Sequence, residues 1–184
     1  MKTKFLIIEF SMIMLLYGCA SNPPALLNGR SLEGAPICLD NREKIPAIVR
    51  KFFNTRDLTT EEGKIDYLIE RVRNSKLVFT RNKVEYDGAS AATFLRWKLN
   101  RWQTKGAKID TAQKFISVIT SGSTTTGQPY TVILQDGSRQ NLQNVLQNEL
   151  DLLEYCLKQY PTKEEVKKTG NTSESNSTLT KVGS

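Results

Sequence analysis

The sequence predicts an α+β fold, built as one small domain of about four helices with a β-hairpin and a second short strand pair in one antiparallel or mixed sheet. Helix-periodic and β-rich segments follow one another without the regular alternation of a doubly wound α/β protein. In the 184-residue chain, the segment that follows Cys19 and the C-terminal tail are poor in core-forming residues. We expect a signal peptide at 1–18, a tether at 19–57, a compact domain at 58–160 and a tail at 161–184.

The first residues have the pattern of a bacterial lipoprotein leader. Lys2 and Lys4 precede an apolar run at 5–17 that is short for a spanning helix, and Leu-Tyr-Gly stands directly before Cys19. Cleavage before Cys19 and acylation of its sulfur are therefore predicted. An ordinary signal peptide that happens to contain a cysteine, or an uncleaved anchor, is the alternative.

The residue after the cysteine bears on where the protein would be sent. Lipoproteins of diderm bacteria that lack aspartate at this position are usually sorted to the outer membrane, and this chain has Ala20. By resemblance to that class, we expect a lipid-anchored protein of the cell envelope at the outer membrane, facing the periplasm. The membrane is then its first partner, through the N-terminal lipid.

The segment that follows predicts a tether. Asn22-Pro23-Pro24, Asn28-Gly29 and Gly34-Ala35-Pro36 interrupt it at intervals too short for a long element. Residues 45–53 carry large apolar side chains at helical spacing and predict a short helix or docking segment.

A helix and a hairpin open the compact domain. Thr59 and Glu62 form a capping-box pattern ahead of a helix whose apolar residues lie on one face and which ends near 74–75. The β-rich segments 77–80 and 84–86 flank an asparagine, Asn82, that suits a tight turn.

Two further helices are predicted from their caps. Asp87 begins a helix that continues to about residue 103, and Asp110 begins a third in which apolar residues share one face to 119. After a polar loop at 121–129, strands are expected at 130–134 and 139–141 around a turn at Asp136-Gly137.

The last helix is predicted over 142–160, where Leu and Val recur as one apolar stripe and Pro161 follows. Beyond it, residues 163–184 are rich in Ser, Thr, Asn and Lys. A segment with so few apolar residues cannot offset its ordering entropy by burial, so a disordered tail is expected.

Composition narrows the function classes. The chain has no histidine, which removes His-dependent triads and the commonest zinc ligand, and neither a metal nor a cofactor is predicted. Its formal net charge is +7, which favours anionic partners such as lipid head groups or cell-wall polymers. Nucleic acid is not an expected partner, because the leader removes the chain from the cytoplasm.

Two cysteines remain besides Cys19. After export, Cys38 and Cys156 would be in an oxidising compartment where a disulfide can persist. Such a bridge would join the N-terminal segment to the last helix. Isolated buried thiols are the alternative.

A candidate binding surface follows from the second helix. At about 100° per residue, Trp97 falls off the apolar arc, with Arg101 one turn along and Arg96 beside it. An exposed aromatic ring among cations suits a sugar ring, a lipid head group or a partner protein. A tryptophan tucked under the linker, or stacked on Arg101 without a ligand, is the alternative.

The loop at 121–129 is dense in hydroxyls and glycine. It could bind an anion or sugar hydroxyls through freed backbone N–H groups, although it lacks the Gly-Lys-Ser/Thr of a Walker loop. The alternative is a capped helix end that turns into a strand.

Several motifs in the central region resemble the YfeK-like family, small exported bacterial proteins classed as a domain of unknown function. They are Leu77-Val78-Phe79-Thr80-Arg81-Asn82, Leu95-Arg96-Trp97-Lys98, Asp110-Thr111-Ala112 and the stretch from Ser121 to Tyr130. The resemblance covers about 61–149 and implies that Arg81, Asn82, Arg96, Gly127, Pro129 and Tyr130 belong to a shared pattern. It implies no activity or catalytic residue. The lipoprotein leader, the tether and the tail depart from that pattern.

Together these observations give a candidate binding surface of Arg81, Arg96, Trp97, Arg101, Gly127 and Tyr130. A lipid-anchored binding or adaptor module for an anionic envelope component or envelope protein is the preferred hypothesis. A small envelope hydrolase or transferase that uses the loop at 121–130 is the first alternative. A structural spacer in an envelope complex is the second.

Overall fold

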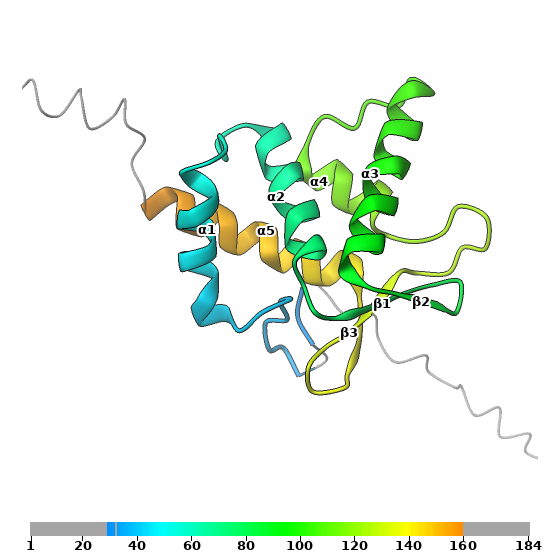
Figure 1. Cartoon of the computed structure of the whole chain (residues 1–184), viewed down its shortest axis with the longest axis horizontal. Coiled ribbons are helices and arrows are strands. Elements are labelled where there is room, and N and C mark those ends of the chain that lie inside the picture. The colour runs from blue at the N-terminus through cyan, green and yellow to red at the C-terminus, as the bar shows by residue number, and fades with distance from the viewer. Residues whose placement is uncertain (1–28, 32, 160–184) are drawn as a thin grey trace, which may run out of the picture.

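A four-stranded sheet and five α-helices form the part of the chain that the computed structural model describes, residues 29–31 and 33–159 (Figure 1). The predicted α+β class is confirmed. The elements are η1 (Arg42–Lys44), α1 (Ile45–Phe53), α2 (Glu61–Arg73), β1 (Val78–Arg81), β2 (Val84–Tyr86), α3 (Gly88–Thr104), α4 (Ala112–Lys114), η2 (Phe115–Ile119), β3 (Thr131–Ile133), β4 (Arg139–Asn141) and α5 (Leu142–Gln159).

The sheet has the order β2-β1-β3-β4, and every neighbouring pair is antiparallel. Strand β1 therefore joins the predicted hairpin to the predicted second strand pair, because Phe79 pairs with Tyr86 on one side and with Val132 on the other. Asn82 and Lys83 at the hairpin turn both have positive φ, 50° and 66°. This is the backbone that a type I′ turn requires and that asparagine tolerates well.

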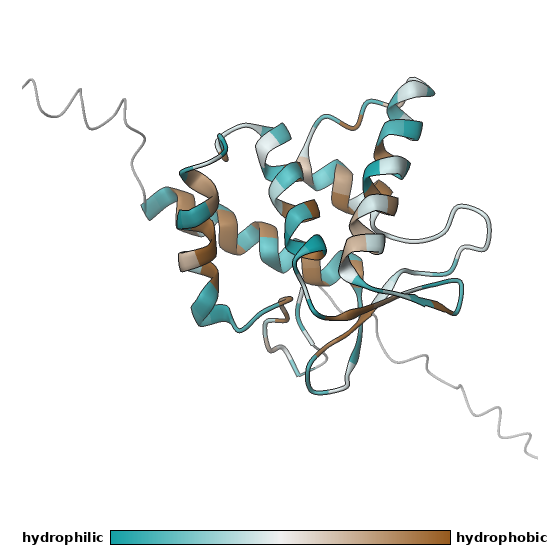
Figure 2. Cartoon of the chain, viewed as in Figure 1, coloured by the Kyte–Doolittle hydropathy of each residue, from teal (hydrophilic) through white to brown (hydrophobic). Residues whose placement is uncertain are grey.

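The core lies between the helices and the sheet. Helix α2 packs against α3, and α1 packs against α5. In Figure 2, apolar and polar residues alternate around α5 and α3, as expected for helices with one buried face. The largest fully buried side chains include Tyr67 of α2, Phe115 of η2 and Leu146 of α5.

The folded domain begins earlier than residue 58. Ile37, Leu39, Ile45 and Val49 are buried members of the same core cluster. Helix α1 places its apolar face on α5, so an amphipathic segment interpreted as part of a tether is an integral part of the domain. The predicted lipidation residue Cys19, the leader at 1–18 and the tail at 161–184 lie outside the described residues.

Buried charges fix this N-terminal segment. The Arg71 guanidinium of α2 pairs with Glu149 of α5 at 3.0 Å and with Asp40 at 2.8 Å. The Leu39 backbone N–H donates to the same Glu149 carboxylate at 2.9 Å. Glu149 is fully buried and Arg71 nearly so, so each charge depends on the other for its solvation.

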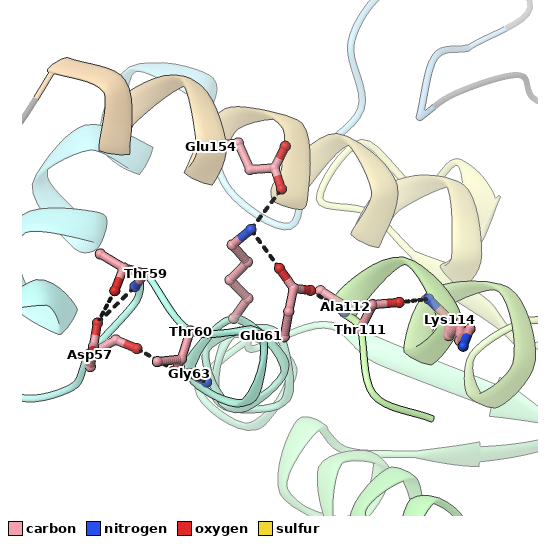
Figure 3. Close-up of polar contacts among 10 residues, drawn as sticks. Asp57, Thr59, Thr60, Glu61, Gly63, Thr111, Ala112, Lys114 and Glu154 are labelled. Carbon is pink, nitrogen blue, oxygen red and sulfur yellow. Dashed lines mark hydrogen bonds and ion pairs between the residues drawn. The ribbon is translucent and has the colours of Figure 1, made fainter. Parts of the chain in front are cut away.

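Two predicted caps are displaced by one residue. Thr60, not Thr59, caps helix α2: its hydroxyl accepts from the Gly63 N–H at 3.0 Å, whereas Thr59 bonds to Asp57 (Figure 3). The Asp57 carboxylate, two residues before Thr59, accepts a hydrogen bond from the Thr59 hydroxyl, so this hydroxyl does not cap the helix. Glu61 then accepts from the Ala112 N–H at 2.8 Å and so joins the starts of α2 and α4.

The third predicted helix is shorter and less regular than expected. Thr111, not Asp110, caps it by accepting from the Lys114 N–H at 3.1 Å, and Asp110 pairs with the Lys114 side chain. After α4 the chain continues as one turn of π-helix, η2. Asp87 caps α3 as predicted, since its carboxylate accepts from the Ser90 N–H at 2.7 Å.

None of the described helices combines the length and the apolar composition that crossing a membrane would need.

The bridge considered between Cys38 and Cys156 is not formed, because both are free thiols. The Cys38 sulfur accepts a hydrogen bond from the Asn148 side chain of α5. Cys156 lies eight residues further along the same helix, which corresponds to about 12 Å of helix rise. That separation exceeds the reach of a disulfide.

Cys38 is expected to react slowly with iodoacetamide in the folded chain at about pH 8. Burial, with the negative charge of Glu149 as a smaller cause, raises the pKa of Cys38 to about 11. The thiolate fraction is then lower than in the unfolded chain by about two orders of magnitude. Mass spectrometry of timed alkylation, with and without urea, measures the ratio. Equal rates in the two conditions would contradict the burial of this thiol.

Candidate functional site

A groove of about 640 Å³ lies between α3 and the loop that follows η2. We call it the α3 groove. It is lined by Arg81, Phe94, Trp97, Lys98, Arg101, Trp102, Lys105, Gly106, Ala107, Ser123, Thr124, Thr125 and Tyr130. One wall is helical, and the other is part of the hydroxyl-rich loop at 121–129.

Four of the six predicted surface residues meet in this groove: Arg81, Trp97, Arg101 and Tyr130. Trp97 is 52 % exposed, and the Arg101 guanidinium lies 5.3 Å from its ring centroid. Trp97 therefore lies off the apolar face as predicted, and it is not tucked under the linker. The stacking on Arg101 that was considered as an alternative is present.

Arg96 and Gly127 do not belong to the groove. The Arg96 guanidinium binds Asp66 of α2, so this side chain joins two helices on another side of α3. Gly127 is exposed at the loop, where its positive φ of 68° closes a turn and its N–H donates to the Ser123 carbonyl at 2.9 Å. Both residues have structural roles that explain their place in the motifs.

Lys98 is the groove residue that the candidate surface omitted. Its side chain is buried, and the ammonium donates to the carbonyls of Ile119 at 2.8 Å and Gly122 at 2.7 Å. A third carbonyl, that of Val118, lies at 3.5 Å. The sequence did contain a signal, because Lys98 stands on the apolar arc of α3, three residues after Leu95.

The groove is strongly positive. Its lining contains four cationic side chains, Arg81, Lys98, Arg101 and Lys105, and no carboxylate. Within the described part of the chain, none of the four forms an ion pair, whereas Arg56, Arg71, Arg73 and Arg96 each do. Unpaired cations held in a concavity raise the local potential for an anion.

The inner end of the groove is aromatic and partly buried. The Arg81 guanidinium lies 4.1 Å from the Phe94 ring centroid, and Phe94 meets Tyr130 edge to face at 5.8 Å. Burial raises the pKa of Tyr130, with the nearby Arg81 charge opposing it. Burial, and secondarily the Arg81 charge, lowers the pKa of Lys98 to about 8. The Lys98 ammonium lies 4.8 Å from the Tyr130 ring centroid, and Arg81 and Tyr130 both contact Phe94, so the three side chains share one poorly solvated space.

The loop wall is held at both ends. Gly122 pairs with Pro129 in an isolated antiparallel bridge, and the Ser123 N–H donates to the Gln128 carbonyl at 2.9 Å. The Thr126 hydroxyl donates to the Asn82 side chain at 2.8 Å, which ties the loop to the β1–β2 turn. Hence the loop presents its hydroxyls from a fixed backbone. The described residues contain no cluster of His, Cys, Asp or Glu side chains that could hold a metal ion.

The fold and this groove define a class: a small α+β domain with one aromatic, positively charged groove. A model of DUF5329, a family of unknown function, matches residues 59–154, and the chain belongs to this family.

A curated relative supports the resemblance noted from the central motifs. The uncharacterized protein YfeK of Salmonella typhimurium (strain LT2) is 35 % identical over 71 residues, which cover 38 % of this chain and 57 % of YfeK. The chain thus spans a little over half the length of this relative. No solved structure matches this chain at a significant level. Neither the family nor the relative indicates an activity.

Proposed function

We propose that this protein is a lipid-anchored binding module of the bacterial envelope that holds an anionic ligand in the α3 groove. The main support is the lining of the groove, which combines four cationic side chains with aromatic and hydroxyl groups and contains no carboxylate. The leader pattern ending at Cys19 supports an anchor at the outer membrane facing the periplasm. An anionic envelope component is the partner that fits both features.

The arrangement is suited to capture. Arg101 in the last turn of α3 and Lys105 at its C-cap are both exposed and line the groove, where they can attract an anion from solution. Arg81 and Lys98 lie where burial weakens solvent screening, so a bound anion interacts with them more strongly than with a surface lysine. Attraction and retention are thus assigned to different residues.

The first alternative, a hydrolase or transferase built on the loop hydroxyls, has weaker support. In a Ser-Lys nucleophile pair a lysine acts as the base for the serine, and the buried Lys98 would have to take this role. Its ammonium, however, donates to main-chain carbonyls of η2 and of the loop, which retain its protons. A base for Ser123 is therefore not offered by this geometry. A spacer role makes no use of an unpaired cationic groove.

Removing the two outer cations is expected to weaken anion binding by about tenfold. Each partly exposed charge contributes up to about 1 kcal/mol, so Arg101→Gln with Lys105→Gln removes roughly 1–2 kcal/mol. Isothermal titration calorimetry with heparin, a generic polyanion, at two salt concentrations measures the effect.

The matched control changes the same charge elsewhere. Arg42→Gln with Lys44→Gln alters η1, which does not line the α3 groove. We expect this variant to bind heparin almost as the natural chain does. An equal loss in both double variants would show that net charge alone binds the polyanion, and it would overturn the proposal.

A further inference from the structure

Arg81 carries hydrogen-bonding capacity that the protein does not use. Its Nε atom is buried and has no hydrogen-bond partner in the described part of the chain. A buried donor without an acceptor is unfavourable, because it has lost its hydrogen bonds to water. A guanidinium presents a planar fork of N–H donors that matches a phosphate or carboxylate. Arg81 lines the α3 groove and forms no ion pair within the described part of the chain, so an anion in the groove meets a guanidinium that no carboxylate neutralises.

Lys98 adds a second positive charge beside Arg81. The two side chains line the same groove, and the proximity of Arg81 is one cause of the lowered pKa of Lys98. Two neighbouring cations without a carboxylate repel each other in a poorly solvated space. A doubly charged anion relieves this repulsion better than a single carboxylate does, which favours phosphate.

The outer part of the groove has a different chemistry. Trp97 offers an exposed ring, and Ser123, Thr124 and Thr125 line the opposite wall with hydroxyls. A pyranose ring has a C–H face that packs on an aromatic ring and hydroxyls at its rim that bond to polar side chains. The outer groove therefore fits a sugar next to the charged inner end.

We propose that the ligand of the α3 groove is a phosphorylated saccharide, with its phosphate at Arg81 and Lys98 and its sugar ring against Trp97. This inference rests on the proposed function and names the ligand class of the same site.

A single nucleic acid strand fits this groove less well. Such strands bind where successive bases can stack on a row of aromatic platforms. Here Arg81 already covers Phe94, and Phe94 meets Tyr130 edge to face with an interplanar angle of 87°. Trp97 is the exposed ring among those lining the described groove. One open platform beside hydroxyls suits one sugar.

The test uses calorimetry of the full chain with glucose 1-phosphate, glucose and inorganic phosphate as separate probes. We expect glucose 1-phosphate to bind more tightly than either part. Arg81→Gln should lower affinity for glucose 1-phosphate and for phosphate by about tenfold or more. Trp97→Ala should lower affinity for the sugar phosphate and leave that for phosphate unchanged.

Matched controls exclude general charge and aromatic effects. Arg42→Gln removes the same charge away from the groove, and Tyr155→Ala removes an exposed aromatic ring from α5. Both should bind glucose 1-phosphate as the natural chain does, and urea unfolding verifies that every variant is folded. Equal affinity of Arg81→Gln and the natural chain would overturn the inference, and so would tighter binding of a thymidine oligonucleotide than of glucose 1-phosphate.

Failure of this inference can be told from failure of the proposed function. Heparin binding that depends on Arg101 and Lys105, without binding of glucose 1-phosphate, keeps an anion-binding groove and rejects the saccharide. The ligand could be a free sugar phosphate or the head group of a glycolipid. To distinguish these two sources, binding to phosphatidylcholine vesicles that contain lipid A is compared with binding to the lipid A saccharide phosphate after its acyl chains have been removed. Binding to both indicates the sugar phosphate alone, binding to the vesicles alone indicates a glycolipid head group, and binding to neither overturns the inference.

Discussion

A chain that begins at residue 58 is expected not to fold. It lacks the fully or nearly buried side chains of Ile37, Leu39, Ile45 and Val49. At about 1.5–3 kcal/mol each, their loss removes roughly 6–12 kcal/mol of burial free energy. That is comparable to the whole stability of a typical domain, about 5–15 kcal/mol. Circular dichroism and urea unfolding measure the result.

A chain that begins at Gly29 is the control and should unfold cooperatively, because it retains the N-terminal segment and α1. The truncated chain also loses Asp40 and the Leu39 N–H, two partners of the buried charges. A cooperative transition of equal midpoint in both chains would contradict the assignment of residues 37–53 to the core.

Replacing Glu149 by Gln is expected to destabilise the protein by about 3–5 kcal/mol. The change removes the fully buried carboxylate and leaves the Arg71 guanidinium paired with the partly exposed Asp40 alone, and removing one member of a buried ion pair has a cost of this size. The lowered urea midpoint at an unchanged slope reports it.

The double variant Arg71→Met with Glu149→Leu provides the comparison. Replacing both charges by apolar side chains of similar size removes the uncompensated charge, so much of the lost stability should return. Asp40 is half-buried and can be solvated once Arg71 is gone. If the double variant is less stable than Glu149→Gln, the pair contributes more than mutual solvation, and this account of it is wrong.

Local patterns were sufficient for most of the fold. The hairpin, the last helix and the cap at Asp87 follow from spacing and turn chemistry within short segments, and each is present. The order of the strands was not predictable in this way. Pairing of β1 with β3 joins residues more than fifty positions apart, and no local signal specifies such a contact.

The N-terminal segment shows why a boundary is harder to predict than an element. Helix α1 was expected from its periodicity, but the prolines and glycines before it favoured a flexible tether over a segment packed against the domain. Its place in the core depends on a tertiary partner, α5, and on the pairing of Asp40 with Arg71. Neither partner is near it in sequence.

Only the part of the candidate site that depends on local spacing was predictable. Trp97 and Arg101 were found because a helix places residues four apart side by side. Arg96 and Gly127 follow the same motifs but serve the α2 contact and the loop turn. Lys98 is not predictable in this way, because a lysine on an apolar arc looks like an interruption of that arc and its carbonyl partners are more than twenty residues away.

Those same carbonyl bonds have a consequence for how a ligand would be received. Lys98 belongs to the helical wall of the groove, while Gly122, whose carbonyl accepts a hydrogen bond from the Lys98 ammonium, belongs to the loop that forms the other wall. The width between the walls is thus set before any ligand arrives, and binding need not order the loop. A pre-organised site of this kind loses little conformational entropy on association, so even a small ligand can be held without a closing motion.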